Sequence, residues 1–181
     1  AHQQDFAQLA GCPAFETQAM STISLLGERI SSSRIRHALA EGDFAHAQAL
    51  LGRSYQISGH VMHGKKLGRT LGYPTANVHL PHRRPALNGV FVVEADTPFG
   101  TLGGVASLGL NPTVESDDRY KLEVHLFDFN GNLYGTRMAV RFLAKLRDEQ
   151  KFDSLAALTA QIAADADAAR HFLSISQKAL A

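Results

Sequence analysis

Between residues 55 and 147 the chain is a succession of strand-type segments separated by turn signals, with no helical pattern between them. The run 121–126 is the clearest case, because Lys, Glu and His alternate there with Leu, Val and Leu, which gives a strand one polar and one buried face. The runs 55–61 and 138–142 alternate in the same way, and Asn130-Gly131-Asn132 is a turn signal of hairpin type. Five or six strands joined in this manner predict an antiparallel barrel rather than a parallel sheet.

The segment before the strands is rich in alanine and contains two helical patterns with clear ends. Ser32 or Ser33 is placed to cap a first helix, and Gly42 supplies a left-handed stop. Asp43 is placed to cap a second helix, which ends at Gly52. Both helices are amphipathic and therefore need a surface to pack on.

A third helical pattern follows the strands, over residues 153–173. Asp153 is a suitable N-cap, and Leu155, Leu158 and Ile162 form an apolar stripe along one side. Such a stripe predicts a helix that flanks or plugs the barrel.

Composition excludes several classes of protein. The 18 Lys and Arg residues and 17 Asp and Glu residues leave a formal charge of +1, which is too balanced for a protein that grips duplex DNA through charge. No apolar run is long enough for a membrane span, and no signal peptide is visible. Cys12 is the single cysteine, so neither an intrachain disulfide nor a cysteine-cluster zinc site can form, and a reducing, cytoplasmic compartment is expected.

The most informative stretch is residues 59–77, GHVMHGKKLGRTLGYPTAN. It holds glycines at positions 59, 64, 68 and 72 and the basic residues Lys65, Lys66 and Arg69. Glycines let backbone N–H groups approach phosphate oxygens, and basic side chains neutralise their charge. The spacing is neither that of a Walker A loop nor that of the dinucleotide fingerprint. The residues alone therefore leave two interpretations open, a phosphate site and a surface turn.

Two further groups could carry chemistry. Thr75 and Asn77 follow Pro74, and their i, i+2 spacing puts both side chains on one face of a strand. A hydroxyl and an amide oxygen side by side suit Mg²⁺ beside a nucleotide, although ordinary strand residues would show the same spacing. Glu123, on the inner wall of a barrel, could take a proton from a substrate hydroxyl, and a solvated strand carboxylate is the alternative.

Two other kinds of site have less support. His60 and His63, then His79 and His82, could supply imidazoles to Zn²⁺, but positions i and i+3 of a strand point to opposite faces. Small barrels also bind single-stranded nucleic acid through basic grooves and exposed aromatic side chains. Here Trp is absent and aromatic residues make up only 8% of the chain, which disfavours that function.

The segment 59–77 resembles the signature of riboflavin kinases, and further ordered blocks fit the same family at residues 89–91, 109–113, 122–128, 134–135 and 142–152. The resemblance covers residues 55–172. It implies a mainly β kinase domain over residues 55–181, a six-stranded antiparallel Greek-key barrel with a C-terminal helix. It also implies phosphoryl transfer from MgATP to the ribityl 5′-hydroxyl of riboflavin, giving FMN and ADP. The expected partners are these small molecules, with no nucleic acid and no membrane. A non-catalytic flavin-binding barrel is the alternative.

The resemblance also implies roles for single residues. Thr75 and Asn77 would hold Mg²⁺ and the ATP phosphates, and Glu123 would orient and deprotonate the 5′-hydroxyl. The implied nucleotide-binding residues are Gly59, His63, Gly64, Lys65, Gly68, Arg69, Gly72, Pro74, Thr75 and Asn77. The implied flavin-binding residues are Gly89, Asn111, Glu123 and Arg147 with the segment after it, and residues 113–120 would form a mobile loop.

Residues 27–36, GERISSSRIR, are similar to the end of the adenylyltransferase domain of bacterial bifunctional riboflavin kinase/FAD synthetases. In that family the serine-rich stretch contacts ATP at a helix N-terminus, which assigns Ser31, Ser32, Ser33 and Arg36 to a remnant of that site. The family's His-x-Gly-His motif and its Rossmann-like strands are not present in the sequence, which begins at Ala1. We therefore expect residues 1–54 to be the remnant of a domain that a longer parent retains. Adenylylation of FMN to FAD is expected in the parent and not in this chain.

Overall fold

The computed structural model describes residues 21–64, 67–80, 85–111 and 119–180. Cys12, Lys65 and His82, and most of the predicted loop 113–120, lie outside this part of the chain. Contacts divide the chain into two compact units, Ala1–Ser31 and Ser32–Ala181, and each is described by itself.

In the first unit the described residues form a short hairpin of β1 (Ser24–Leu25) and β2 (Glu28–Arg29). Its two-residue turn requires positive φ at both positions, and Leu26 has φ 52° while Gly27 has φ 80°. The described residues of this unit are therefore strand and turn rather than helix. The interpretation of residues 1–54 as a Rossmann-like remnant stays a prediction.

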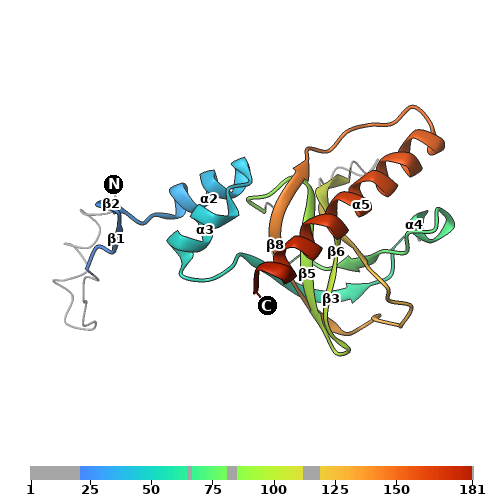
Figure 1. Cartoon of the computed structure of the whole chain (residues 1–181), viewed down its shortest axis with the longest axis horizontal. Coiled ribbons are helices and arrows are strands. Elements are labelled where there is room, and N and C mark those ends of the chain that lie inside the picture. Colours follow the sequence, from blue (N-terminus) through green and yellow to red (C-terminus); the bar gives the residue numbers. More distant parts are fainter. Residues whose placement is uncertain (1–20, 65–66, 81–84, 112–118, 181) are drawn as a thin grey trace, which may run out of the picture. The chain divides into compact units, whose positions relative to one another are not determined.

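The second unit is built on a closed barrel of six antiparallel strands in the order β3-β4-β7-β6-β5-β8 (Figure 1). The strands are β3 (Gln56–Met62), β4 (Ala76–Val78), β5 (Gly89–Thr97), β6 (Gly100–Asn111), β7 (Arg119–Leu126) and β8 (Arg137–Arg147). In the barrel β8 lies beside β5, which is followed by β6 and β7, and this order is that of a Greek key. The predicted barrel is confirmed.

The turn signal at Asn130-Gly131-Asn132 does not join neighbouring strands, so its interpretation as a hairpin turn was wrong. β7 pairs with β4 and β6, whereas β8 pairs with β3 and β5. The segment 127–136 therefore connects strands that are separated by two others. Within it, the Asn132 Oδ1 atom accepts a hydrogen bond of 3.0 Å from the backbone N–H of Tyr134, a local turn that a long connection uses as readily as a hairpin.

Alternate residues of each strand point into the barrel, as the sequence pattern predicts. In β7, Leu122 and Val124 are fully buried, and they join Phe91 and Phe142 in one hydrophobic core. Two helices, α2 (Ser32–Glu41) and α3 (Phe44–Leu51), share this core. The Phe44 ring meets the Phe91 ring edge to face, with 6.0 Å between centroids. The contacts thus place a unit boundary after Ser31, and the domain boundary between residues 54 and 55 stays a prediction.

Of the predicted helix ends, Gly42, Asp43 and Gly52 agree with the structure, whereas the predicted N-caps Ser32 or Ser33 and Asp153 do not, since α2 begins at Ser32 itself. Gly42 and Gly52 both have positive φ, and the Asp43 carboxylate accepts a hydrogen bond of 2.9 Å from the backbone N–H of His46. The long helix α5 (Leu155–Leu180) is capped by Ser154 rather than Asp153, because the Ser154 hydroxyl accepts from the N–H of Ala157 at 3.1 Å.

Helix α5 flanks the barrel and does not plug it (Figure 1). Its Ala166 and Ala169 pack with Val92 of β5 and with Phe127, which directly follows β7. Among the described residues, none of the helices combines the length and the hydropathy that a membrane crossing requires.

Candidate functional site

A row of residues crosses five strands on the outer face of the barrel. Asn77 of β4 lies opposite Glu123 of β7, which lies opposite Ser107 of β6. Ser107 lies opposite Val90 of β5, and Val90 lies opposite Arg147 of β8. Residues directly opposite each other in antiparallel strands share a face. The backbone register alone therefore brings Asn77, Glu123 and Arg147 onto one surface.

Glu123 lies on the outer face of the barrel, and the expectation of an inner wall was wrong. Its neighbours Leu122 and Val124 point into the core, and the period of a strand then turns Glu123 outward. The polar face of this strand is the one that α5 approaches, so a half-buried carboxylate faces a cavity and not only solvent.

A bulge in β8 aims Arg147 onto the same face. Lys145 lies opposite Phe91 and Arg147 lies opposite Val90, so Leu146 is an extra residue in the ladder. Such a bulge re-aims the side chains that follow it. If the pairing of Phe91 with Lys145 continued without this extra residue, Leu146 would lie opposite Val90; a second register shift lies between Val92 and Val93.

The outer row forms one side of a cavity of about 610 Å³ beside α5, which we call the helix cavity. Charged groups come from Glu123, Arg147, Glu149, Lys151 and Asp165, and further polar groups come from Ser107, His125 and Gln150. The apolar part of the wall includes Tyr73, Val105, Leu110, Phe152, Leu158 and Ile162. A mostly apolar pocket with a few convergent polar groups is typical of a small-molecule site.

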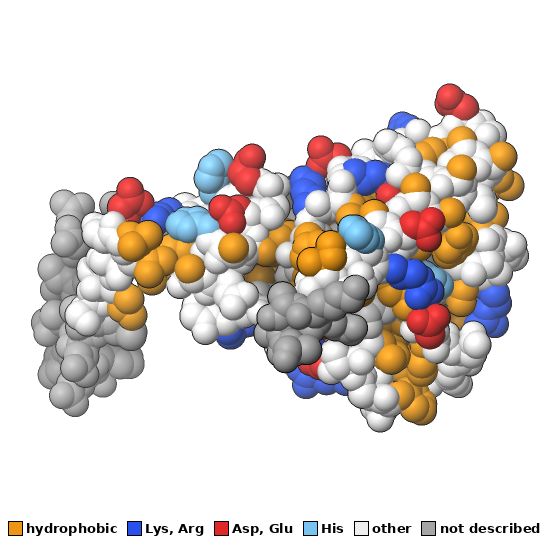
Figure 2. Space-filling view, viewed as in Figure 1, with side chains coloured by type: hydrophobic (Ala, Val, Ile, Leu, Met, Phe, Trp, Pro, Cys, Tyr) orange, Lys and Arg blue, Asp and Glu red, His pale blue; other side chains and the backbone are white. Residues whose placement is uncertain are grey.

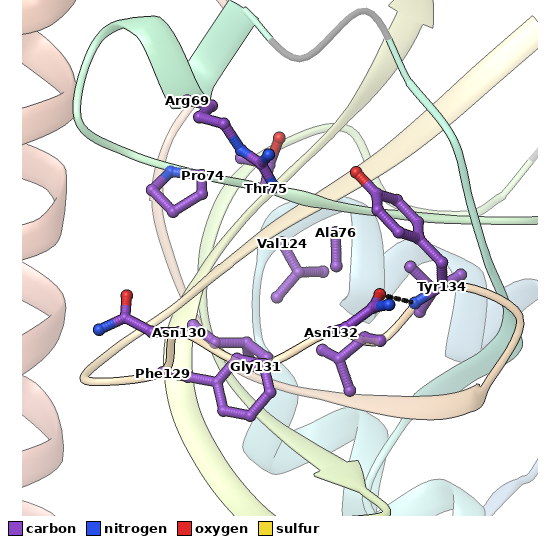
Figure 3. Close-up of a pocket in the computed structure, with 13 residues that line it drawn as sticks. Arg69, Pro74, Thr75, Ala76, Val124, Phe129, Asn130, Gly131, Asn132 and Tyr134 are labelled. Carbon is purple, nitrogen blue, oxygen red and sulfur yellow. Dashed lines mark hydrogen bonds between the residues drawn. The ribbon is translucent and has the colours of Figure 1, made fainter.

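A second cavity, also of about 610 Å³, opens onto the inner side of the strands, and we call it the loop cavity. Its walls are formed by Val61, Arg69, Pro74, Thr75, Ala76, Val124, Leu126 and residues 129–134. Figure 3 shows Arg69 and Thr75 on one side of this cavity and Asn130 and Asn132 on the other. Polar groups thus face each other across the opening, above a floor of core residues.

The two cavities meet at Thr75 and are otherwise separated by the strand β7. On β7, Val124 lines the loop cavity while Glu123 and His125 line the helix cavity. The cavities therefore lie on the inner and outer faces of the same strand. Thr75, directly before β4, is the residue among those described that lines both.

The glycines of the 59–77 segment bring the chain close over Thr75 and Asn77. A Cβ atom on Gly68 would lie 2.3 Å from the carbonyl oxygen of Tyr73 and 3.5 Å from the Thr75 hydroxyl. A Cβ atom on Gly64 would lie 2.3 Å from the Asn77 amide nitrogen. The one-turn helix α4 (Leu67–Thr70) contains Gly68 and carries Arg69 to the loop cavity.

The oxygen atoms of Thr75 and Asn77 are of the kind that Mg²⁺ accepts beside phosphates. Among the described residues no three His, Cys, Asp or Glu side chains gather in a way that could hold a metal. His60, His63 and His79 form no such group, and His82 is not among the described positions. On the barrel face in Figure 2, basic and acidic side chains are interspersed over the described surface, which does not favour a nucleic-acid groove there.

The riboflavin kinase model of the family named Flavokinase matches residues 51–173. The chain belongs to the riboflavin kinase family. It is 50% identical over 167 residues to a bifunctional riboflavin kinase/FMN adenylyltransferase of Pseudomonas fluorescens, a match that covers 92% of this chain and 54% of that protein. It is 44% identical over 169 residues to the protein of that name from Escherichia coli (strain K12), covering 91% and 53%. The chain thus spans about half the length of these relatives.

Among solved structures, the chain is similar to a Streptococcus pneumoniae protein described as a macrolide-efflux protein. The TM-score is 0.72 and the identity 38%, and the match covers 82% of this chain and 49% of that one.

Several residues that the resemblance to riboflavin kinases singled out lie outside the walls of both cavities. A Cβ atom on Gly59 would lie 2.0 Å from the carbonyl oxygen of His79, so this glycine allows a close approach of two chain segments. The His63 ring lies against the Tyr134 ring, with 3.9 Å between centroids. Gly72 has φ 85° in the turn after α4. None of these three residues lines either cavity, and their roles in nucleotide binding stay predictions.

The remaining predicted residues lie further along the strands and helices. Gly89 has φ 131° and lies against the backbone carbonyl of Arg147. Asn111 ends β6, opposite Arg119. On α2, Ser32, Ser33 and Arg36 are exposed and line neither cavity, and Ser31 belongs to the first unit.

Sequence reasoning missed Asp165 and the wall at 129–134 of this riboflavin kinase fold, and it included Glu149 only as part of the segment after Arg147. Glu149 lies over Gly109 and accepts a hydrogen bond of 3.4 Å from the Ser107 hydroxyl, and burial raises the pKa of its carboxyl group. Asp165 is buried against Arg147. For Glu149 the mid-strand Gly109 was a further signal, because such a glycine marks a place where another group comes close.

Proposed function

We propose that the chain transfers the γ-phosphoryl group of MgATP to the ribityl 5′-hydroxyl of riboflavin, giving FMN and ADP. The observation that carries this proposal is the meeting of two cavities at Thr75, with Glu123 beside the junction. Direct transfer requires two substrates to approach end to end, and catalysis then rests mainly on positioning and charge neutralisation.

The helix cavity fits riboflavin. Aromatic and aliphatic walls suit the flat tricyclic ring, and the polar row suits a polyhydroxylated chain. Glu123 lies where Asn77 and Thr75 approach the same wall, so the end of the ribityl chain belongs there.

The loop cavity and the glycine segment above it fit MgATP. Arg69 brings positive charge, and the glycines let backbone groups approach the phosphates. Thr75 and Asn77 would hold Mg²⁺, which supplies neutralisation of phosphate charge when bound. The nucleoside end would then lie toward Asn130 and Asn132.

Glu123 accepts the proton of the 5′-hydroxyl as its oxygen attacks the γ-phosphorus. The bond between that phosphorus and the bridging oxygen of ADP breaks, and ADP leaves with the electron pair. Adenylylation of FMN is assigned to a longer parent protein, with residues 1–54 as its remnant. Because ATP is a substrate, we place the reaction in the cytoplasm.

The direct test is incubation of the protein with riboflavin and MgATP, followed by chromatography of the flavins. FMN without FAD is the expected product. FAD would overturn the assignment of adenylylation to the parent alone. Bound riboflavin without any FMN would overturn the kinase proposal in favour of a non-catalytic flavin-binding barrel.

A further inference from the structure

Asp165 of α5 is the one buried charged side chain among the residues that the structure describes, with 6% of its surface exposed. Arg147 Nε donates to both carboxylate oxygens, at 3.0 and 3.1 Å, and Arg147 Nη2 donates to Oδ2 at 2.8 Å. Gln161 Nε2 donates to Oδ1 at 2.9 Å. A well-packed apolar pair would hold a helix to a barrel at least as firmly as a buried ion pair. Stability alone therefore does not explain why Asp165 and Arg147 form a buried ion pair at this position.

Several contacts hold the Arg147 guanidinium in place, but they do not engage all of its N–H groups. Its Nη1 donates to the carbonyl oxygen of Asp148 at 2.9 Å, and its guanidinium carbon lies 5.7 Å from the centre of the Phe152 ring. A guanidinium has five N–H groups, and three are engaged by these contacts. One N–H on each terminal nitrogen has no partner among the described residues, and Arg147 lines the helix cavity.

The outer row fixes how far Arg147 lies from Glu123. Three inter-strand steps separate them, from β7 through β6 and β5 to β8. At about 4.8 Å per step their backbones are about 14 Å apart, which is the length scale of an extended flavin molecule. With the 5′-hydroxyl at Glu123, Arg147 lies at the ring end.

We propose that Asp165 is a positioning residue, which holds Arg147 so that its two remaining N–H groups meet the oxygen acceptors of the isoalloxazine ring. Helix α5 thereby sets the affinity for flavin in addition to covering the barrel. This inference rests on the proposed function and deepens it, because it assigns the ring end of the helix cavity.

The chain offers a matched control on the same helix. Arg170 of α5 pairs with Asp128 at 3.0 Å, where Asp128 is exposed and both residues lie outside the walls of the two cavities. Both Asp165→Asn and Asp128→Asn remove one ion pair between α5 and the barrel. Only Asp165→Asn removes a contact that holds Arg147 in the wall of the helix cavity.

The experiment measures the affinity for riboflavin and for lumiflavin, which lacks the ribityl chain, by quenching of flavin fluorescence in Asp165→Asn, Asp128→Asn and the unchanged protein. MgADP affinity and the unfolding temperature are measured alongside. We expect Asp165→Asn to weaken both flavins about tenfold or more, the scale of a lost hydrogen bond to a charged group, and to leave MgADP binding unchanged. Asp128→Asn should leave all three affinities unchanged.

A second variant keeps the test decisive if Asp165→Asn does not fold. Gln161→Ala removes one donor to the Asp165 carboxylate and should weaken both flavins in the same direction, by a smaller factor. Unchanged flavin affinity in a folded Asp165→Asn or in Gln161→Ala overturns the inference, as does an equal loss for flavins and MgADP. If the unchanged protein makes FMN but the variants show no such effect, only the role of Asp165 is rejected. If the unchanged protein makes no FMN, the proposed function itself is rejected.

Discussion

The helix cavity and the loop cavity have the same volume and share the strand β7, yet they are built in different ways. The polar row of the helix cavity is fixed by strand register, since Glu123, Ser107 and Arg147 sit at paired positions of the ladder. The loop cavity takes most of its polar groups from connections, at 69–75 and 129–134. The strand β7 thus separates the two cavities. The polar residues of the helix cavity are positioned by backbone hydrogen bonds between strands, and those of the loop cavity are positioned by turns.

This difference assigns different tasks to the two cavities. A rigid outer row can hold a flat ring and a reacting hydroxyl in one geometry. Connections with glycine and asparagine supply backbone groups to a flexible chain of phosphates. The predictions below test whether a change in one cavity affects one substrate only.

The largest effect is expected from Glu123→Gln, which keeps the shape of the side chain and removes the proton acceptor. We expect kcat for FMN formation to fall by about 10²- to 10⁴-fold, the usual range for a positioned base, while MgADP affinity stays the same. Lys121→Gln is the control, because Lys121 lies on the same face of β7 and outside both cavities. Turnover near that of the unchanged protein would remove Glu123 from the mechanism.

Thr75→Ala tests the junction of the cavities. Since Thr75 lines both, the loss of its hydroxyl should weaken MgATP at low Mg²⁺ and also raise KM for riboflavin, each by about two- to tenfold. Steady-state kinetics with each substrate varied in turn measures both values, and Thr75→Ser should restore them. An effect on riboflavin alone, with unchanged nucleotide affinity, would contradict the placement of Thr75 beside the metal and the phosphates.

The helix cavity was the more predictable of the two from sequence, and the reason is periodicity. The alternation over 121–126 predicts a polar face that includes Glu123, because a strand repeats every two residues. The same pattern does not say which face the rest of the chain covers, and the inner wall was therefore the wrong choice. Residues of other strands, such as Arg147, follow only from register, and a bulge at Leu146 changes that register without a local sequence signal.

The loop cavity was predicted only in part, through Arg69, Pro74 and Thr75, because its other polar wall at 129–134 is a connection without a period. Asn130-Gly131-Asn132 fits a hairpin turn as well as a long connection, and only the strand order distinguishes the two. Asp165 was equally hidden, since one acidic residue in a helix pattern is typical of a solvated face. Its burial depends on Arg147, which lies 18 residues earlier in the chain.

A matched pair of glycine variants changes one cavity at a time. A Cβ atom at Gly109 would lie 1.9 Å from the Glu149 carboxylate, and one at Gly131 would lie 2.4 Å from the Phe129 ring. Each new methyl group should displace a flexible side chain. We expect Gly109→Ala to raise KM for riboflavin and Gly131→Ala to raise KM for MgATP, each by about two- to tenfold. If either variant changes both KM values alike, the division of substrates between the cavities is wrong.

The smallest effect concerns stability and pH, and it belongs to the helix cavity through Glu149. Burial raises the pKa of this carboxyl above 4.5, and the Ser107 hydrogen bond and Arg147 oppose that shift only in part. A raised pKa means that the folded protein holds the proton more tightly than the unfolded chain, so this contribution to stability is complete below pH 4.5 and is lost as pH rises through the folded pKa. In Glu149→Gln the side chain stays neutral at every pH, so this pH-dependent contribution to stability is absent.

The unfolding temperature of Glu149→Gln, relative to the unchanged protein, should therefore increase as pH rises from 4 to 7. The Glu149 side chain is exposed, so solvent screens its charge and the change should be small. Gly131→Ala is the control, because no carboxylate is among the described residues that line the loop cavity, and its difference from the unchanged protein should not vary with pH. A pH-independent difference for Glu149→Gln would mean that solvent reaches this carboxylate freely, and the wall beside Ser107 would then be open rather than closed.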